Sequence, residues 1–275
     1  MTHDGALAAP SLFSRYAFPM SVHGLESMSP ASGDCHLLEL ALREDGFAFI
    51  GAGVMRALLG NGRAHAAQAW AEFAASWGDL ADDNYLAKVG LRRRRRHAVF
   101  TATADGDVQR APHQPHYQSR DYNTLQGGIE RWFEPIRPEV ADSLPMRRLL
   151  GFAHALFGRL APHVGHWHVE AHQFRIEALP EHHGQPTPEG MHRDGVNFVM
   201  VVLLDRHNIT SGTTSIHALD GGEIGSFTLT RPLDTAFVDD GRVYHGVTAV
   251  APLDPAQAAW RDVLVVTFRA IAEAV

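Results

Sequence analysis

The sequence predicts an α+β fold, in which helices come first and a β-rich half follows. Over residues 138–160 the apolar side chains recur at the spacing of one helix face, and Pro162 ends the pattern. After this proline come short β-branched and aromatic runs, separated by clusters of Gly, Asn, Asp and Pro. Several short strands at such spacing are typical of a β-sandwich or barrel. We therefore expect a β core at residues 163–275, with the helical and mixed residues 34–162 packed on one sheet.

Helix and strand patterns assign most of the chain to secondary structure. Helical spacing of apolar residues, or a capping Asp34, marks the helices, and β-branched or aromatic runs mark the strands. Before residue 162 we expect helices at residues 34–43, 62–77 and 138–160, a strand at Phe47–Ile50 and an extended segment at residues 84–103. After it we expect strands at residues 173–179, 196–204, 213–219, 226–229, 235–238, 243–250 and 263–268.

The composition is that of a globular protein. Of the 275 residues, 45% are hydrophobic and 20% are charged, which argues against a disordered chain and against a coiled coil. Residues 1–33 are rich in Ser, Pro, Gly and Ala, so we expect a poorly ordered lead-in there. No internal repeat or flexible linker is visible beyond it. Residues 34–275 are therefore predicted to form a single domain.

The lengths of the apolar runs and the number of cysteines limit where the protein is located and which ligands a metal site can have. No run reaches the roughly 18 apolar residues that cross a bilayer, and the N-terminus lacks the layout of a signal peptide. We therefore expect a cytoplasmic protein without a membrane partner. Cys35 is the single cysteine, so neither an intrachain disulfide nor a cysteine-based metal site is possible. Any metal must be held by nitrogen and oxygen ligands, which favours iron over structural zinc.

The charge balance argues against a nucleic-acid partner. The net charge is −7, whereas phosphate neutralisation requires a basic field. Residues 92–96 form an uninterrupted run of five arginines before the strand-like residues 98–103. In a strand, alternate arginines point to opposite faces. We interpret the run as a solvated or ion-paired strand; a role near the active site and a nucleic-acid contact are the alternatives.

Residues 110–138 form a long segment without helical or strand periodicity. Irregular connections of this length usually carry function, so we expect a wall or lid of a site. The alternative is a structural loop that is held in place by Trp132 and Phe133.

Two histidines and one aspartate are predicted to hold a metal ion. His192 and Asp194 are two residues apart and precede a buried strand, so both side chains can point to the same side. His245 opens a second β-branched run further along the chain. Two imidazoles and one carboxylate on one side of an ion form the facial triad of non-haem Fe(II) oxygenases. Such ligands suit the mouth of a double-stranded β-helix, a jelly-roll or cupin-like fold.

A second His-x-acid pair, His168 and Glu170, competes with this assignment. Three more histidines lie nearby, at positions 163, 166 and 172. We interpret the cluster as a polar connection between helix and strand with solvated imidazoles.

Several segments together resemble the bacterial 2OG-Fe dioxygenase family that includes free L-isoleucine and L-leucine hydroxylases. The resemblance covers roughly residues 35 to 270, although Ser211-Gly212-Thr213-Thr214 replaces an expected Gly-Gly pair. It is carried by the segments LRRRRR, QSRDYNTLQGG, RWFEP, PEGMHRDG, NFVMVVLLDRHN, GTTSI, YHGVTAV and RDVLVVTF.

The resemblance implies an Fe(II)- and 2-oxoglutarate-dependent dioxygenase, which consumes O2 and releases succinate and CO2. It implies iron ligation by His192, Asp194 and His245, and binding of 2-oxoglutarate by Arg261. The substrate is expected to be a small molecule, a free L-amino acid that is hydroxylated on its side chain. Gln173 and Arg175 share one strand face, and they are expected either to contact substrate or cosubstrate or to face solvent.

Two other classes of function fit parts of the pattern. A zinc-dependent hydrolase could use the same three ligands around a bound hydroxide, with Glu189 as a base. A non-catalytic β-sandwich that binds a sugar or a protein would leave the three residues without a role.

Overall fold

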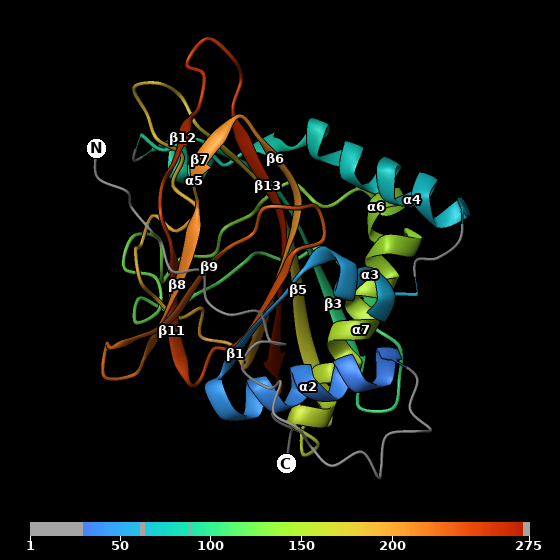
Figure 1. Cartoon of the computed structure of the whole chain (residues 1–275). Helices are drawn as coiled ribbons and strands as arrows, with labels where there is room; N and C mark the ends of the chain where they lie inside the picture. The colour runs from blue at the N-terminus through green and yellow to red at the C-terminus, as the bar shows by residue number, and fades with distance from the viewer. Residues whose placement is uncertain (1–29, 61–63, 89, 272–275) are drawn as a thin grey trace.

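The computed structural model describes residues 30–60, 64–88 and 90–271 and arranges them in layers (Figure 1). A large antiparallel sheet stands at the centre, helices cover one face of it, and smaller sheets lie on the other side. This mixture of helices and antiparallel sheets agrees with the expected jelly-roll fold. Most of the predicted lead-in lies outside the described residues, and residues 30–33 belong to the first described helix. No helix in the described part of the chain is long and apolar enough to cross a membrane.

The first half contains the helices and four of the strands of the large sheet. The helices are α2 (Pro30–Asp45), α3 (Ala52–Leu58), α4 (Ala64–Ala75), α5 (Asn84–Ala87), α6 (Pro138–Ala141) and α7 (Leu144–Leu160), with a 3₁₀ turn, η1 (Ser76–Asp79). The strands are β1 (Phe47–Ile50), β2 (Ala81–Asp82), β3 (Arg93–Thr103) and the short β4 (Gln109–Arg110), which pairs with β3.

The second half consists of strands. They are β5 (His166–Glu177), β6 (Phe198–His207), β7 (Ile209–Ser211), β8 (Thr213–Ala218), β9 (Glu223–Thr228), β10 (Thr235–Asp239), β11 (Val243–Val247), β12 (Val250–Pro252) and β13 (Trp260–Ala270). The large sheet has the order β1-β10-β6-β13-β5-β3-β2, and the small sheets are β11-β8-β9 and β12-β7.

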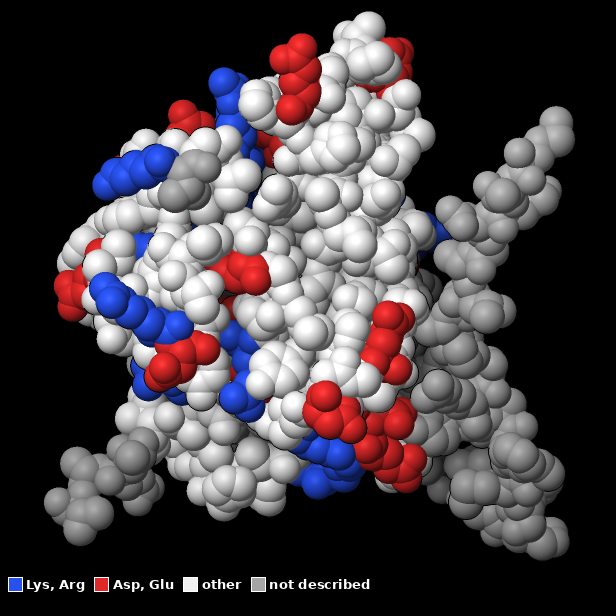
Figure 2. Space-filling view, turned by 90° about the vertical axis from the view of Figure 1, so that its left-hand side faces the viewer, with Lys and Arg blue, Asp and Glu red and all other residues white. Residues whose placement is uncertain are grey.

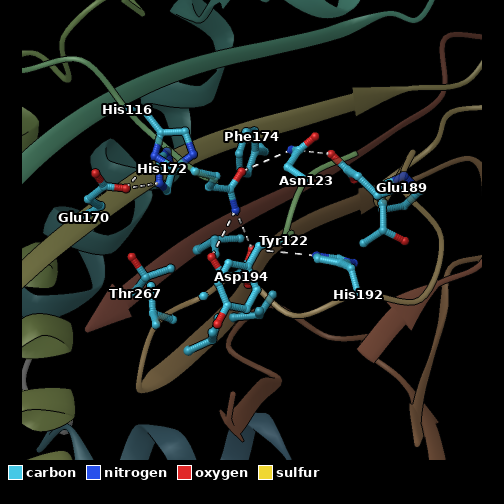
Figure 3. Close-up of a pocket in the computed structure, with 18 of the residues that line it drawn as sticks. His116, Tyr122, Asn123, Glu170, His172, Phe174, Glu189, His192, Asp194 and Thr267 are labelled. Carbon is cyan, nitrogen blue, oxygen red and sulfur yellow. Dashed lines mark hydrogen bonds and ion pairs between the residues drawn. The ribbon is translucent and has the colours of Figure 1, made fainter. Parts of the chain in front are cut away.

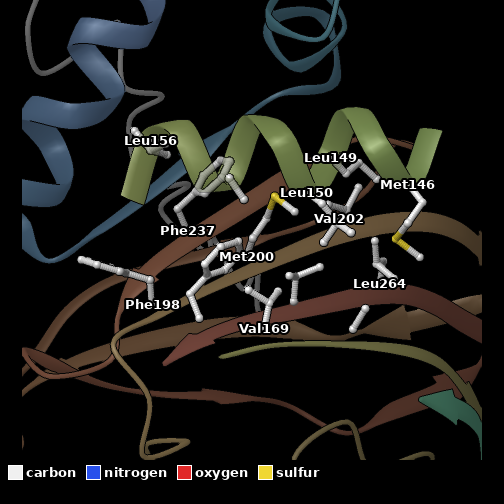
Figure 4. Close-up of a cluster of buried hydrophobic side chains, with 14 of the residues drawn as sticks. Met146, Leu149, Leu150, Leu156, Val169, Phe198, Met200, Val202, Phe237 and Leu264 are labelled. Carbon is white, nitrogen blue, oxygen red and sulfur yellow. The ribbon is translucent and has the colours of Figure 1, made fainter. Parts of the chain in front are cut away.

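The helix layer packs on every second residue of the large sheet. Leu264 of β13 and Met200 and Val202 of β6 point toward α7, and Val266 and Phe268 of β13 belong to the same apolar cluster. Figure 4 shows α7 lying across these side chains with its own apolar face turned to them. The predicted apolar stripe of this helix is therefore confirmed from Leu149 onward, whereas Leu144, predicted to belong to it, is 42% exposed. Each fully buried Leu or Phe side chain stabilises such a layer by roughly 1.5–3 kcal/mol.

The opposite residues of the same strands face the small sheets. Val263 of β13 and Val199 and Leu203 of β6 form a second apolar cluster with Ile216 and Phe227 of the small sheet. Alternate residues of one strand thus belong to two cores, as period-two side-chain geometry requires. Polar residues that share this face point into the space between the sheets, where the site lies.

Three of the differences between the predicted and the observed elements bear on the site or have a clear local cause. The helix expected at residues 138–160 is two helices, because Ser143 starts α7 anew: its Oγ accepts a hydrogen bond from the N–H of Met146. Helix α5 interrupts the segment expected to be extended, because the Asp83 carboxylate caps it. The strand expected at residues 173–179 already begins at His166.

That last difference corrects the interpretation of the histidine-rich connection, which holds for the exposed His163 and His166 but not for Glu170 and His172. Trp167, Val169 and Ala171 are fully buried on the helix side, so the polar residues between them form a regular alternating strand. Glu170 and His172 are buried too, because this polar face borders the space between the sheets instead of solvent.

Candidate active site

The structure brings His192, Asp194 and His245 together at one end of the large sheet. His192 and Asp194 lie in the segment before β6, and His245 lies on β11 of the small sheet. The backbones of His192 and His245 pair through two hydrogen bonds of 2.9 Å. Because this bridge links segments that are far apart in the sequence, it fixes the relative position of both rings.

The three side chains form one compact cluster. Asp194 Oδ1 lies 3.7 Å from His192 Nε2, and Asp194 Oδ2 lies 3.5 Å from His245 Nε2. Burial lowers the pKa of His192, but the hydrogen bond and charge of Asp194 outweigh burial and raise the pKa to about 9. Burial raises the pKa of Asp194, whereas its contacts with both imidazoles hold that pKa well below its ordinary value. The cluster therefore attracts positive charge.

The donor set fits a divalent transition metal. One potential ligand atom from each residue lies within 4.8 Å of the others. His192 Nδ1 lies 3.0 Å from the carbonyl oxygen of Gly190, so Nδ1 carries a hydrogen, and Nε2 is the nitrogen that can coordinate a metal once it releases its own proton. Two imidazoles and a carboxylate on one side leave the cavity side open for other ligands.

Asp240 holds the ligand segment in place, and sequence reasoning missed it. Its Oδ1 accepts a hydrogen bond of 2.8 Å from the N–H of Asp194, and its Oδ2 accepts bonds from Gly195 and Val196 at 2.8 and 3.1 Å. Burial and the charge of Asp194 raise the pKa of Asp240. The acidic pair Asp239-Asp240 before Gly241 was the sequence signal of a functional turn.

A cavity of about 640 Å³ lies between the sheets and opens beside these three residues (Figure 3). Its volume is in the range of small-molecule sites. Valine side chains of β6, β10 and β13 line its walls, and a few charged groups interrupt them. On the face in Figure 2, acidic and basic side chains are interspersed, so this face has no continuous basic surface for a polyanion.

The irregular segment after β4 forms one wall of this cavity. Gln118 donates its Nε2 to Asp194 Oδ1 at 3.3 Å and to the Asp194 carbonyl oxygen at 3.3 Å. Asn123 donates to Gln118 Oε1 at 3.1 Å and to Glu189 Oε1 at 2.9 Å. The segment is thus tied to the predicted ligand Asp194, a contact that neither its length nor its resemblance motifs had specified.

Gly195 of the ligand segment packs tightly against Tyr122 of this wall. Its φ is +78°, and a Cβ there would lie 2.5 Å from Cδ2 of Tyr122. Gly190 has the same φ of +78°, but a Cβ on it would meet nothing within 4 Å.

We predict that Gly195→Ala destabilises the protein more than Gly190→Ala does. Both variants incur the left-handed backbone cost of roughly 1–2 kcal/mol. Gly195→Ala must also displace the Tyr122 ring, which adds roughly 1–3 kcal/mol of overpacking. Urea denaturation of both variants measures the difference in the free energy of unfolding. Equal losses would contradict the tight contact with Tyr122.

Arg261 lies in the wall of the cavity, near the start of β13. It is 2% exposed, its Nε has no hydrogen-bond partner, and no carboxylate of the described residues forms an ion pair with it. Burial and the nearby charge of Arg206 lower the pKa of Arg261 to about 10. Asp262 pairs with Arg175, and Asp254 binds its own loop, so neither neutralises Arg261. A buried guanidinium without an anion is suited to bind a carboxylate ligand.

Gln173 and Arg175 do not lie in the cavity. Arg175 donates Nε and Nη2 to Asp262 at 2.8 and 2.6 Å, and Gln173 donates to Ser76 Oγ at 2.9 Å. Both side chains lie on the face of β5 that is turned toward the helices, whereas Glu170 and His172 lie on the opposite face. The structure therefore separates them from the other predicted site residues.

The arginine run alternates across β3 as predicted. Arg94 pairs with Glu177, and Arg96 pairs with Asp79 on one face. Arg93 and Arg95 line the cavity on the other face, where both approach Asp83, at 2.9 and 3.6 Å. The run is thus an ion-paired strand, and one of its faces borders the site.

Comparisons with known proteins agree with this geometry. A family model for 2OG-Fe dioxygenases matches residues 74–267. The crystal structure of a bsmA homolog from Methylobium petroleophilum PM1 is 37% identical in sequence and has a TM-score of 0.76; the match covers 87% of this chain and 96% of that one. No curated protein gives a significant match.

Two further structures share the fold at lower identity. IDO from Bacillus thuringiensis is 18% identical, with a TM-score of 0.72 over 93% of this chain and 99% of that chain. The Fe(II)/α-ketoglutarate-dependent dioxygenase TqaL is 20% identical, with a TM-score of 0.69 over 88% and 89%. Because the family model matches most of the chain and a solved structure is 37% identical to it, the chain belongs to the 2OG-Fe dioxygenase family. Members of this family use Fe(II), 2-oxoglutarate and O2.

Proposed function

We propose that this dioxygenase hydroxylates the side chain of a small substrate, a free L-amino acid, with His192, Asp194 and His245 as the iron ligands. The observation that carries the proposal is the buried Arg261 without an anionic partner, in the same cavity as the three ligands. Iron and a short diacid together would engage both features, whereas a metal alone would leave Arg261 unused.

Each residue of the cavity has a distinct task in this proposal. His192, Asp194 and His245 hold the metal through two neutral nitrogens and one carboxylate oxygen. Arg261 binds the distal carboxylate of 2-oxoglutarate, and the bidentate geometry of a guanidinium sets its direction. When bound, iron and 2-oxoglutarate supply the oxidation, in which O2 and 2-oxoglutarate yield succinate, CO2 and a hydroxylated substrate.

The remaining walls exclude water and limit the size of the substrate. Val199, Val201, Val263 and Val265 give the cavity apolar surfaces that suit an aliphatic side chain. Gln118 keeps the Asp194 carboxylate oriented from the other side. A dry, apolar wall beside the metal protects the reaction from solvent.

A screen of succinate release tests the substrate class. The purified protein with Fe(II), ascorbate and 2-oxoglutarate is incubated with each free L-amino acid, with short peptides and with oligonucleotides. Aliphatic amino acids are expected to raise succinate formation at least about tenfold above the uncoupled rate, because binding completes the water-excluding cavity. Stimulation by oligonucleotides and by no amino acid would overturn the substrate class and return the arginine run to a nucleic-acid role.

The zinc hydrolase remains the rival for the same ligands. Anaerobic titration with Fe(II) and 2-oxoglutarate separates the two, since the chelated cosubstrate gives a weak visible charge-transfer band. An absent band under saturating conditions would reject the iron assignment. A hydrolase would also have no use for the buried charge of Arg261.

A further inference from the structure

Away from the predicted iron ligands, the cavity contains a second centre of charge, the carboxylate of Glu170 (Figure 3). His116 Nδ1 lies 2.6 Å from its Oε2, and His168 Nε2 lies 3.2 Å from its Oε1. His172 Nε2 lies 3.4 Å from Oε2. Burial raises the pKa of Glu170, but hydrogen bonds from these imidazoles outweigh burial and hold the pKa well below its ordinary range. Glu170 is therefore ionised at neutral pH.

Two of the imidazoles beside Glu170, those of His97 and His172, do not neutralise its charge. Burial lowers the pKa of His172 well below its ordinary value and that of His97 to about 4, so both rings are neutral at pH 7. Their rings stack at 4.7 Å, and His97 Nε2 is 3.8 Å from Glu170 Oε1, beyond hydrogen-bond length. No arginine or lysine of the described residues forms an ion pair with Glu170. A negative charge thus borders the cavity without an arginine or lysine partner among the described residues.

A second metal ion is one candidate for that charge. His97, His116, Glu170 and His172 place potential ligand atoms within 4.8 Å of one another. Arg95 argues against a metal, because its Nη2 lies 2.6 Å from His172 Nδ1 and can only donate. The ring hydrogen must then sit on Nε2, the atom that faces Glu170, where it blocks coordination. An organic ammonium group fits better, because it donates hydrogen bonds to the Glu170 oxygens and needs no lone pair from His172.

Arg131 supplies the opposite charge in the same cavity. It is 2% exposed, and its Nη1 and Nη2 donate to Gln126 Oε1 at 3.0 Å and Gln118 Oε1 at 2.8 Å. Both partners are neutral amides, its Nε has no hydrogen-bond partner, and no carboxylate of the described residues forms an ion pair with it. Burial, followed by the charge of Arg93, lowers the pKa of Arg131. A buried cation without an anion therefore accompanies the buried anion.

His116 connects the two charges. Its backbone N–H and carbonyl pair with those of Arg131 at 2.9 Å each, while its side chain contacts Glu170. An α-amino acid carries an ammonium group and a carboxylate on the same carbon atom. We propose that Glu170 binds the α-ammonium group and Arg131 the α-carboxylate of a free amino acid. This inference rests on the proposed function, because it names the substrate contacts within the same cavity.

The sheet register orients such a substrate toward the iron ligands. Glu170 on β5 lies opposite Thr267 on β13, which lies opposite Val199 on β6. At about 4.8 Å per strand, Glu170 is roughly 10 Å from β6, the strand that follows Asp194. The side chain of an amino acid held at Glu170 and Arg131 can span this distance along the apolar wall.

Calorimetric binding measurements under anaerobic conditions test the proposal without turnover. The protein loaded with Fe(II) and 2-oxoglutarate is titrated with each free L-amino acid, L-leucine and L-isoleucine included. The tightest binder is then compared with two analogues, the carboxylic acid without its amino group and the amine without its carboxylate. For the unmodified protein, each analogue is expected to bind at least about thirtyfold more weakly, equivalent to about 2 kcal/mol.

The variants assign each lost charge to one residue. Glu170→Gln is expected to remove the preference for the amino acid over the des-amino analogue, and Arg131→Gln the preference over the amine. Glu130→Gln is the matched control, since Glu130 lies exposed at the cavity rim beside Arg131, and both preferences should persist. Should a variant fail to fold, the analogue series on the unmodified protein still shows whether the site recognises the ammonium group and the carboxylate.

Several outcomes would overturn the proposal. These are the absence of binding by any free amino acid, equal affinity for the des-amino analogue, or unchanged preferences in both variants. Zinc binding by Asp194→Ala protein that is lost on adding Glu170→Gln would instead assign the cluster to a metal. The visible band of the Fe(II) and 2-oxoglutarate complex is recorded first. If the band is present but the protein does not discriminate between the amino acid and its analogues, only this inference is rejected. If the band is absent, the proposed function is rejected.

Discussion

Asp194→Ala protein is expected to lose iron binding and succinate formation while it keeps its fold. Asp194 contributes the only anionic atom among the three predicted ligands, and its carboxylate contacts both imidazoles. Replacing a residue that merely supports a metal ligand typically costs 10–100-fold in affinity or activity, so loss of the ligand itself should cost more than about 100-fold. Iron affinity, measured by titration, and coupled turnover check the prediction.

The fold should survive because the Asp194 side chain takes no part in either apolar cluster. Asp240 still accepts hydrogen bonds from the backbone of residues 194–196 in the variant, because those donors are main-chain groups. Asp220→Ala, in the exposed turn between β8 and β9, is a control in which iron affinity should not change. Full turnover and unchanged iron affinity in Asp194→Ala would show that the ligand assignment is wrong.

The arrangement of His192 and Asp194 was predictable because it is local. Two residues of one extended segment, separated by one position, point to the same side in any fold that keeps the segment extended. For His245 to join them, its strand had only to pair with the segment that contains His192. The β-branched run after His245 indicated such a strand. The strands of the second half were predictable for the same reason, since period-two patterns and turn residues are local signals.

The face to which a strand residue points was not predictable in the same way. Gln173 and Arg175 were expected to share a face, and they do, but that face packs against η1 and Asp262. Glu170 and His172 on the other phase reach the cavity instead. The alternation of side chains divides the residues of a strand between its two faces. Only the neighbouring layers of the fold determine which face borders the site.

Contacts between distant segments escaped sequence reasoning altogether. His116 and Arg131 pair across an irregular segment, and Arg131 then reaches Gln118, which contacts Asp194. No periodicity marks these residues, because the segment has no regular structure. Its length, its polar composition and its part in the family resemblance marked the segment, but none of these signals assigns contacts to single residues.

Arg261→Gln is expected to raise the apparent KM for 2-oxoglutarate at least about thirtyfold, with iron affinity and the KM for the prime substrate little altered. Loss of a buried charge-assisted carboxylate pair typically costs 2–5 kcal/mol, and about 2 kcal/mol already corresponds to that factor. Arg269→Gln is the matched control, because Arg269 lies on the same strand and the same face. Eight residues separate the two arginines, so at about 3.3 Å per residue they stand roughly 26 Å apart, too far for one short diacid.

Stability separates this role from a structural one. A buried guanidinium whose partners do not include a carboxylate of the described residues is costly to desolvate in the free protein. Arg261→Gln is therefore expected to leave the free energy of unfolding unchanged or higher without 2-oxoglutarate, and to abolish the added stability that 2-oxoglutarate confers on the native protein. A threefold or smaller change in KM for Arg261→Gln, together with a large change for Arg269→Gln, would transfer the role to Arg269. A large loss of stability without ligand would make Arg261 a structural residue, because the native state alone would then depend on its charge.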